Sequence, residues 1–207
     1  MALVKYNNNS ISAVTSASSI PVGALTHIKT LTASSSATLS FVDGSNDVVL
    51  DSTYPIYKFE FINIHPSADG AGLTLNLSID SGSNYNVTKT TTFFRARHSE
   101  AGSGTELIYV DGHDVAQSTG TARMCENIGN ANDETGSGYL HLFNPSSDTF
   151  VKHFMSVWST YNSNDYARQE NMAGYGNTTS AINGIQFAMT SGNIDSGKIK
   201  LYGIKDS

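Results

Sequence analysis

The chain has 207 residues, which is enough for one sizeable hydrophobic core, so we expect a single domain. A formal net charge of -6 and only 14% charged residues, without a dense basic block, argue against nucleic acid or an anionic membrane as the main partner. A single cysteine, Cys125, excludes both an intramolecular disulfide and a thiolate metal cluster.

The segment 1–24 is predicted to form an extended N-terminal docking arm. Its part from 7 to 24 is mostly Asn, Ser, Ala and Thr, and the scattered apolar residues follow neither a helical nor a strand period. These apolar residues are too few to fold alone and more numerous than a free linker needs, which favours docking against a neighbouring subunit. A flexible N-terminus that docks nowhere is the alternative interpretation, and the composition fits it equally well.

The segment 25–207 is predicted to form one β-sandwich domain, because short alternating segments are separated by turn-forming clusters. The fold class is therefore all-β, an antiparallel two-sheet sandwich of the jelly-roll type. Leu73 to Ile79 is the clearest strand, with aliphatic residues at odd positions and polar residues at even positions, so one face should be buried and the other wet. The segment 57–64 changes parity after Phe61, which indicates a bulge or a strand covered on both faces. Further strands are expected at 26–31, 37–41, 47–50, 87–94, 107–110, 139–143, 149–158, 184–189 and 198–203.

Helix content should be low. Only two short segments are candidates for helices, 112–117 and 166–172. The region from Ala101 to Gly138 is polar and rich in glycine, and it is expected to form long loops beside one edge strand.

The sequence contains no pattern that assembles a catalytic site. The six histidines are dispersed, and Asp111-Gly112-His113-Asp114 is more typical of a solvated turn than of a cation site or a base. The acidic stretch that begins at Asp43 lacks the glycine and the glutamate of a helix–loop–helix calcium site, and a hairpin turn explains it more simply. We therefore predict no catalytic residues, no metal ligands and no cofactor.

Aromatic residues near the end of the predicted 149–158 strand are candidates for a different role. Trp158 shares parity with Phe150 and Phe154, which favours burial in the core. Tyr161, Tyr166 and Tyr175 lie among Asn, Asp and Gly residues and are better candidates for the surface. Exposed tyrosines of this kind suit either a sugar ligand or a protein interface, so these three are the predicted ligand-binding residues.

Four segments together resemble a family of small structural proteins of marine tailed bacteriophages. They are Ser40-Phe41-Val42-Asp43-Gly44, the strand ending Phe61-Ile62-Asn63-Ile64-His65-Pro66, Leu142-Phe143-Asn144-Pro145-Ser146, and the C-terminal run from Thr179 to Ile204. The end of that run is also similar to the last strand of jelly-roll modules on phage fibres and head decorations. The resemblance covers nearly the whole chain.

This resemblance implies a non-enzymatic virion component. We expect a surface decoration or cement protein, or a tail-associated or fibre-associated module, that binds other virion proteins as a homo-oligomer, with a homotrimer favoured. The alternative is a module that binds host-surface glycan. The localisation would be the virion, assembled in the host cytoplasm, with no nucleic acid partner and no membrane insertion. On this reading Leu3, Val4, Tyr6, Ile11 and Val14 of the arm contact the particle or a sister subunit.

Overall fold

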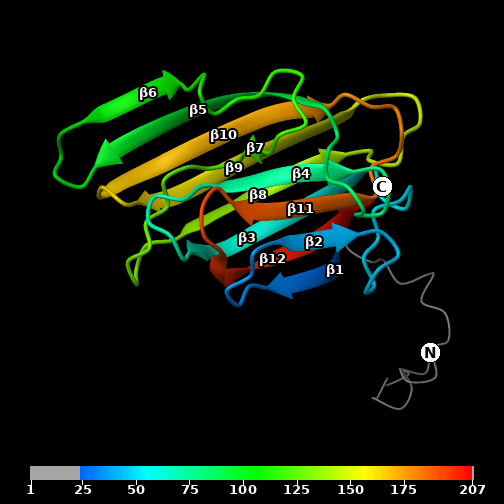
Figure 1. Cartoon of the computed structure of the whole chain (residues 1–207), viewed down its shortest axis with the longest axis horizontal. Coiled ribbons are helices and arrows are strands. Elements are labelled where there is room, and N and C mark those ends of the chain that lie inside the picture. The colour runs from blue at the N-terminus through cyan, green and yellow to red at the C-terminus, as the bar shows by residue number, and fades with distance from the viewer. Residues whose placement is uncertain (1–23, 207) are drawn as a thin grey trace, which may run out of the picture.

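A computed structural model describes residues 24–206, and all of its regular structure is β-strand. Twelve strands follow one another along the chain (Figure 1): β1 (Leu25–Thr32), β2 (Leu39–Val42), β3 (Ile56–Pro66), β4 (Leu73–Ser78), β5 (Lys89–Ser99), β6 (Thr105–Tyr109), β7 (Ala122–Arg123), β8 (Gly136–Phe143), β9 (Lys152–Asn162), β10 (Tyr166–Gly176), β11 (Gly184–Met189) and β12 (Ile194–Ile204). The prediction of an all-β sandwich is confirmed.

The strands form two antiparallel sheets of unequal width. The larger sheet has eight strands in the order β1-β12-β3-β8-β9-β10-β5-β6, and the smaller has four in the order β2-β11-β4-β7. Figure 1 shows the smaller sheet lying over only part of the larger one, with β5 and β6 extending beyond it. The outer side of the larger sheet is not covered by any second sheet in residues 24–206.

The core lies between the two sheets and is rich in aromatic residues. Phe187 of the small sheet meets Phe41, Phe59 and Phe61 with ring centroids 5.1 to 6.3 Å apart and steep interplanar angles. Edge-to-face contacts of this kind are favourable beyond the area that they bury. Trp158 packs on Phe61 at 4.7 Å and is 1% exposed, so the prediction that Trp158 is a core residue is confirmed.

The expected irregularity in β3 is a bulge. The pairing of β3 with β8 shifts between Phe61 and Ile64, and Asn63 has a φ of 50°. Asparagine adopts this left-handed conformation more readily than most residues. The shift returns Ile64 to the buried side of the sheet, where it is fully covered.

The prediction that one face of β4 is wet was wrong, because the whole strand is buried. The polar residues are covered and bonded: Thr74 Oγ1 donates to the Ala188 carbonyl at 2.8 Å, and Asn76 Nδ2 donates to the Thr119 carbonyl at 3.2 Å. Lys89 Nζ, fully buried, donates to Asn76 Oδ1 at 2.5 Å. A polar alternation therefore marks hydrogen-bonded burial here rather than solvent exposure.

Both helix predictions were wrong. The segment 166–172 belongs to β10, which pairs along its whole length with β9 on one side and β5 on the other. The segment 112–117 forms turns and extended chain that bond to β5, with Thr91 N donating to the Val115 carbonyl at 2.8 Å. In both places, pairing to neighbouring strands outweighs a weak local preference for helix.

The predicted strand at 47–50 was also wrong. Asn46 and Asp47 adopt left-handed φ values of 50° and 63°, and Asp43 Oδ1 accepts a hydrogen bond from Leu50 N at 2.8 Å. The segment is a turn that buries Val48 and Leu50 at the end of the core. The remaining predicted strands are present with displaced boundaries, and β11 begins and ends where the sequence predicts.

Candidate interaction face

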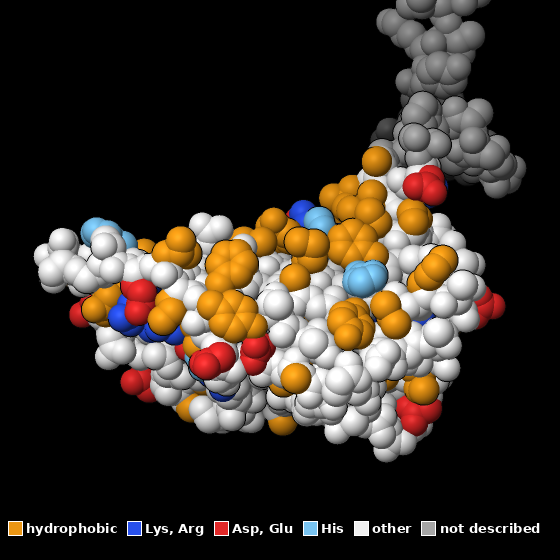
Figure 2. Space-filling view, turned by 90° about the horizontal axis from the view of Figure 1, so that it is seen from above, with side chains coloured by type: hydrophobic (Ala, Val, Ile, Leu, Met, Phe, Trp, Pro, Cys, Tyr) orange, Lys and Arg blue, Asp and Glu red, His pale blue; other side chains and the backbone are white. Residues whose placement is uncertain are grey.

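The outer side of the eight-stranded sheet, which we call the open face, carries the largest group of uncovered apolar and aromatic residues on one sheet. Side chains alternate along each strand, so every second residue of β9 is buried and the others point to the open face. Met155 is 54% exposed and Tyr139 is 39% exposed on this face. Figure 2 shows hydrophobic and histidine side chains gathered along the hollowed upper side of the molecule.

The strand register arranges these side chains in two parallel rows that cross the sheet, which we call the aromatic rows. The first row contains Leu25, Ile204, Ile56, Phe143, His153 and Tyr175. The second contains His27, Tyr202, Lys58, His141, Met155 and Ala173. Because each strand contributes alternate residues to the two rows, their side chains are near neighbours on one face.

Ring contacts link the residues within and beside these rows. His27 meets Tyr202 with ring centroids 5.3 Å apart, and His153 meets Tyr175 at 6.2 Å. His141 lies between Tyr139 at 5.3 Å and Phe143 at 6.0 Å. These ring contacts form three groups, and the strand register places the groups side by side on the open face.

The charges of the aromatic rows are few and are compensated locally. Lys58 Nζ lies 2.8 Å from Glu60 Oε1 and 5.6 Å from the centre of the Tyr139 ring. Burial and the nearby charge of Lys58 lower the pKa of His141 below its usual value, which favours the neutral imidazole at pH 7. A surface with little net charge can be desolvated at low cost when a partner covers it.

A shallow hollow of about 390 Å³ opens at the end of the rows near β5, β9 and β10. Its apolar walls come from Phe143, Met155 and Ala173, while His153 and Tyr175 supply polar tips. Thr90 and Thr92 close the β5 side. A hollow of this composition can hold an apolar side chain or one face of a sugar ring.

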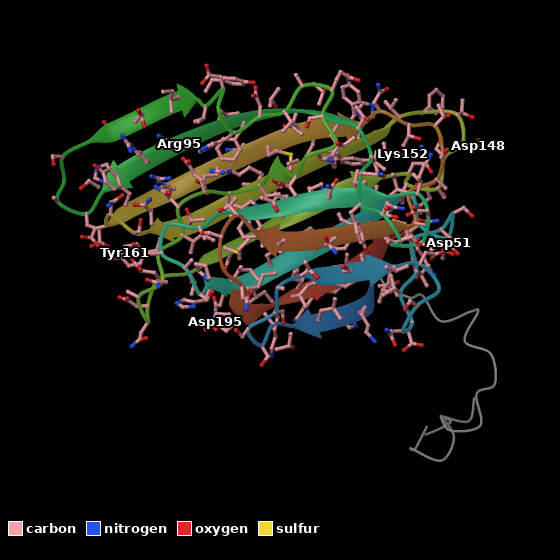
Figure 3. The ribbon with its side chains drawn as sticks, in the orientation of Figure 1. Asp51, Arg95, Asp148, Lys152, Tyr161 and Asp195 are labelled. Carbon is pink, nitrogen blue, oxygen red and sulfur yellow. The ribbon has the colours of Figure 1, made fainter. Side chains whose placement is uncertain are left out.

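The structure does not bring the three predicted ligand-binding tyrosines together. Tyr175 lines the hollow, whereas Tyr161 points from the open face at the far end of β9; Figure 3 labels Tyr161 and Lys152 at opposite ends of that strand. The register places Tyr161 opposite Ala167 of β10, and the span from Ala167 to Tyr175 along that strand is roughly 27 Å.

Tyr166 also lies away from the hollow. Tyr166 belongs to the inner side of the sheet, where the Arg97 guanidinium stacks on its ring at 4.9 Å. The predicted arm contacts, Leu3, Val4, Tyr6, Ile11 and Val14, lie outside the described residues.

A second group of chemistry-bearing residues lies on the inner side of the large sheet, between β5, β10 and the chain that leads to Ile128. Glu126 is its centre: the carboxylate contacts Arg95, lies 2.9 Å from Arg168 Nη1, and lies 2.9 Å from His113 Nδ1. Figure 3 labels Arg95 at the β5 end of this group. The Glu126 side chain is only 6% exposed, so these pairs are strongly desolvated. Together with Glu170, we call this group the buried ion cluster.

The buried ion cluster holds two carboxylates in different protonation states. Burial opposes ionisation of Glu126, but His113, Arg168 and Arg95 outweigh that effect and lower its pKa to about 2. Glu170 is completely buried, and burial together with the charge of Glu126 raises its pKa to about 8. Glu170 accepts hydrogen bonds from Glu126 N at 3.2 Å and from Thr160 Oγ1 at 3.3 Å.

No local pattern in the sequence signals this cluster, because its members are dispersed from Arg95 to Glu170 and meet only through strand pairing and loop packing. The Asp111–Asp114 segment, predicted as a solvated turn, supplies His113, whose Nε2 lies 3.0 Å from Arg123 Nη1. The cluster is enclosed and ion-paired, an arrangement that fastens the long loop to the sheet. Within the described chain, no group of three or more His, Cys, Asp or Glu side chains has the geometry of a metal site.

Comparisons with known proteins returned no match to a protein-family model, to a curated protein or to a solved structure. Among residues 24–206 there is no helix long and apolar enough to cross a membrane.

Proposed function

We propose that the protein is a non-enzymatic structural component of a tailed-bacteriophage virion, a surface decoration or cement protein or a tail-associated or fibre-associated module, that binds other virion subunits. The observation that carries the proposal is the pair of aromatic rows on the open face. Their exposed, locally neutral apolar surface is suited to contact with another protein. The N-terminal arm, with Leu3, Val4, Tyr6, Ile11 and Val14, is the second contact in this proposal.

The strand order supports a jelly-roll assignment. Strands β1, β12, β3 and β8 form one half of the larger sheet, and β2, β11, β4 and β7 form the opposing sheet. This interleaving is the order that two Greek keys give in a jelly roll, and it leaves β9, β10, β5 and β6 as an extension of one sheet. Modules of this type assemble in several copies on a particle, where many modest contacts act together. We propose a homo-oligomer, with the trimer as the expected form.

Location and copy number are tested on the source particle by gold-labelled antibody microscopy. Dense label over the head is expected of a decoration or cement protein, and label confined to the tail is expected of a tail or fibre module. Particles that carry no label would overturn the proposed function.

The contact role of the aromatic rows is tested with two variants on one strand. Met155→Glu places a charge in the second row, whereas Ser159→Glu places the same charge on the same face outside the rows. We expect Met155→Glu to reduce incorporation into particles at least tenfold with an unchanged melting temperature, and Ser159→Glu to incorporate normally. Equal incorporation of both variants would show that the aromatic rows do not contact the particle.

The second candidate function is binding of host-surface glycan, favoured by the hollow that contains Tyr175 and His153. In that case the purified protein shows saturable binding to host polysaccharide, and Tyr175→Ala weakens it while Tyr161→Ala at the far end of β9 does not. Absence of saturable binding rejects this candidate.

A further inference from the structure

Strand β6 ends the eight-stranded sheet and leaves one row of backbone groups without strand partners in the described chain. Figure 1 shows β6 along the upper edge of the molecule, and β5 is its one hydrogen-bonded neighbour in the sheet. Val110 N donates to the Phe93 carbonyl at 2.9 Å, and the register places Ile108 opposite Arg95. Because hydrogen-bonded pairs alternate in an antiparallel ladder, Glu106, Ile108 and Val110 direct their backbone groups to β5. The alternate residues Thr105, Leu107 and Tyr109 direct theirs away from the sheet.

The side chains of this edge are unusually apolar. Leu107 is 76% exposed, Tyr109 51% and Ile108 41%, and Phe94 on the adjacent strand is 45% exposed. Edge strands of monomeric proteins are normally protected by lysine, proline, a bulge or a covering segment. β6 contains no lysine, no proline and no bulge.

The other sheet edges differ from β6. β1, at the opposite end of the same sheet, has a register irregularity between His27 and Lys29 and carries Lys29 itself. In the small sheet, β7 has only two residues and β2 only four. Among the described strands, β6 is therefore the longest edge that lacks these protective features.

The one charged residue of β6 is neutralised within its own chain. Glu106 Oε2 lies 2.8 Å from Arg97 Nε and 3.2 Å from Arg95 Nη2. The carboxylate of Glu106 is therefore already paired with arginines of its own chain when a second β6 approaches. Two copies of this edge can come together without strong repulsion between their glutamates.

We propose that β6 pairs with β6 of a second copy of this chain, in antiparallel orientation about a twofold axis at Leu107. In this register Leu107 faces the Leu107 of the other copy, and each Thr105 faces a Tyr109. All three residues with outward backbone groups then form hydrogen-bonded pairs, two bonds to each pair. The contact is isologous, so it closes after two copies.

Neighbouring registers of the two β6 strands are less favourable. An axis at Glu106 would place the two glutamates directly opposite each other, which is unfavourable even for compensated carboxylates. An axis at Ile108 would form only two hydrogen-bonded pairs within β6 and would leave Thr105 outside the strand ladder. The axis at Leu107 is the register that pairs every outward group of β6.

The first experiment measures the mass of the full-length chain in solution by light scattering, independently of any particle. The wild-type mass should be an even multiple of the mass of one chain. If the chain is also trimeric, the β6 contact would join two trimers. Leu107→Lys should halve the mass, because two ammonium groups would meet across the axis. Phe150→Lys, which alters another strongly exposed residue away from β6, should leave the mass unchanged. A wild-type chain that stays monomeric at high concentration, or a mass that Leu107→Lys does not change, overturns the proposal.

The second experiment tests the register by oxidative cross-linking. Cys125 is fully buried, so Leu107→Cys would supply the only accessible thiol among the described residues. Directly opposed residues of a ladder lie about 5.5 Å apart at Cα, within reach of a disulfide. We expect Leu107→Cys to give a cross-linked dimer and Thr105→Cys, whose two copies would lie about 14 Å apart along the strand direction, to give none.

Two outcomes of the cross-linking overturn the pairing at Leu107. One is failure of Leu107→Cys to cross-link, and the other is preferential cross-linking of Thr105→Cys. A β6 that accepts a strand from a different protein would give no cross-linked dimer of the purified chain.

Discussion

At the scale of single residues, the buried ion cluster shows how charge is accommodated on the inner side of a sheet. Glu126, in the loop between β7 and β8, is ionised because three cationic or hydrogen-bonding groups surround it, whereas Glu170 of β10 shares one arginine with it. Two carboxylates this close cannot both ionise at low cost, so one keeps its proton. The ion pairs of the cluster offset the cost of burying its charges, and removal of one member would leave a buried charge without its partner.

Glu126→Gln should destabilise the fold by about 3–5 kcal/mol, because Arg95 and Arg168 would keep buried charges without their main counter-charge. Urea unfolding at pH 7 measures this loss. Glu60→Gln, which breaks the half-exposed Lys58 pair, is the matched control and should cost less than about 1 kcal/mol. Similar losses for the two variants would show that the cluster is not strongly desolvated.

The raised pKa of Glu170 predicts a pH dependence of stability with a definite sign. The folded state holds the proton up to about pH 8, while the unfolded glutamate loses it near its ordinary pKa of 4.5, so the folded state binds more protons between these values. Stability contributed by this group is therefore full below about pH 4.5 and declines as the pH rises to 8. Denaturant unfolding of Glu170→Gln across this window should lack that decline. A parallel decline in the variant and in the wild type would assign the pH dependence to other groups.

At the scale of elements, close approach between strands and loops depends on glycine at particular positions. Gly203 of β12 lies under the Tyr54 ring, and a Cβ there would come within 2.3 Å of that ring. Tyr54 in turn meets Tyr57 edge to face at 5.7 Å. The glycine of the Leu-Tyr-Gly ending thus permits the loop before β3 to close over the end of the sheet.

Gly203→Ala should displace the Tyr54 ring and cost about 1–3 kcal/mol, as overpacking of a filled site does. Thermal unfolding and the near-ultraviolet signal of the tyrosines report the stability and the displacement. Gly112→Ala, where an added Cβ meets nothing within 4 Å, is the control and should leave both signals unchanged. If Gly203→Ala is as stable as the wild type, the close packing of the Tyr54 ring on Gly203 does not contribute to stability.

At the scale of the whole molecule, the two sheets have different structural roles. The four-stranded sheet closes the core, while the extension β9, β10, β5 and β6 enlarges the open face and ends in the unprotected β6 edge. Every buried hydrophobic residue of the described chain lies between Ala33 and Leu201, so this core is built from that part of the sequence. None of these core residues belongs to the aromatic rows or to β6.

Deletion of the segment 2–14 should abolish incorporation into particles and leave the melting temperature within about 2 °C of the wild type, since it removes none of these core residues. Incorporation of the truncated protein at the wild-type level would exclude a role for the arm in attachment. A large fall in melting temperature would instead indicate that the arm contributes to the fold.

Local patterns in the sequence were sufficient to predict the β-rich class and most of the strands, because alternation of apolar and polar residues is a property of each short segment. They also predicted the core position of Trp158 and the irregularity after Phe61. In all of these features, the spacing of neighbouring residues determines which side is buried or where a strand ends.

The remaining features emerged with the fold, because they depend on pairing between distant segments. The segment 166–172 has a helix-compatible composition, yet strands on both sides complete its backbone hydrogen bonds as part of β10. The same pairing separates the three predicted ligand-binding tyrosines, assembles the buried ion cluster and aligns residues from different strands into the aromatic rows. Register and sheet order are properties of long-range pairing, and a single sequence does not encode them in any local period.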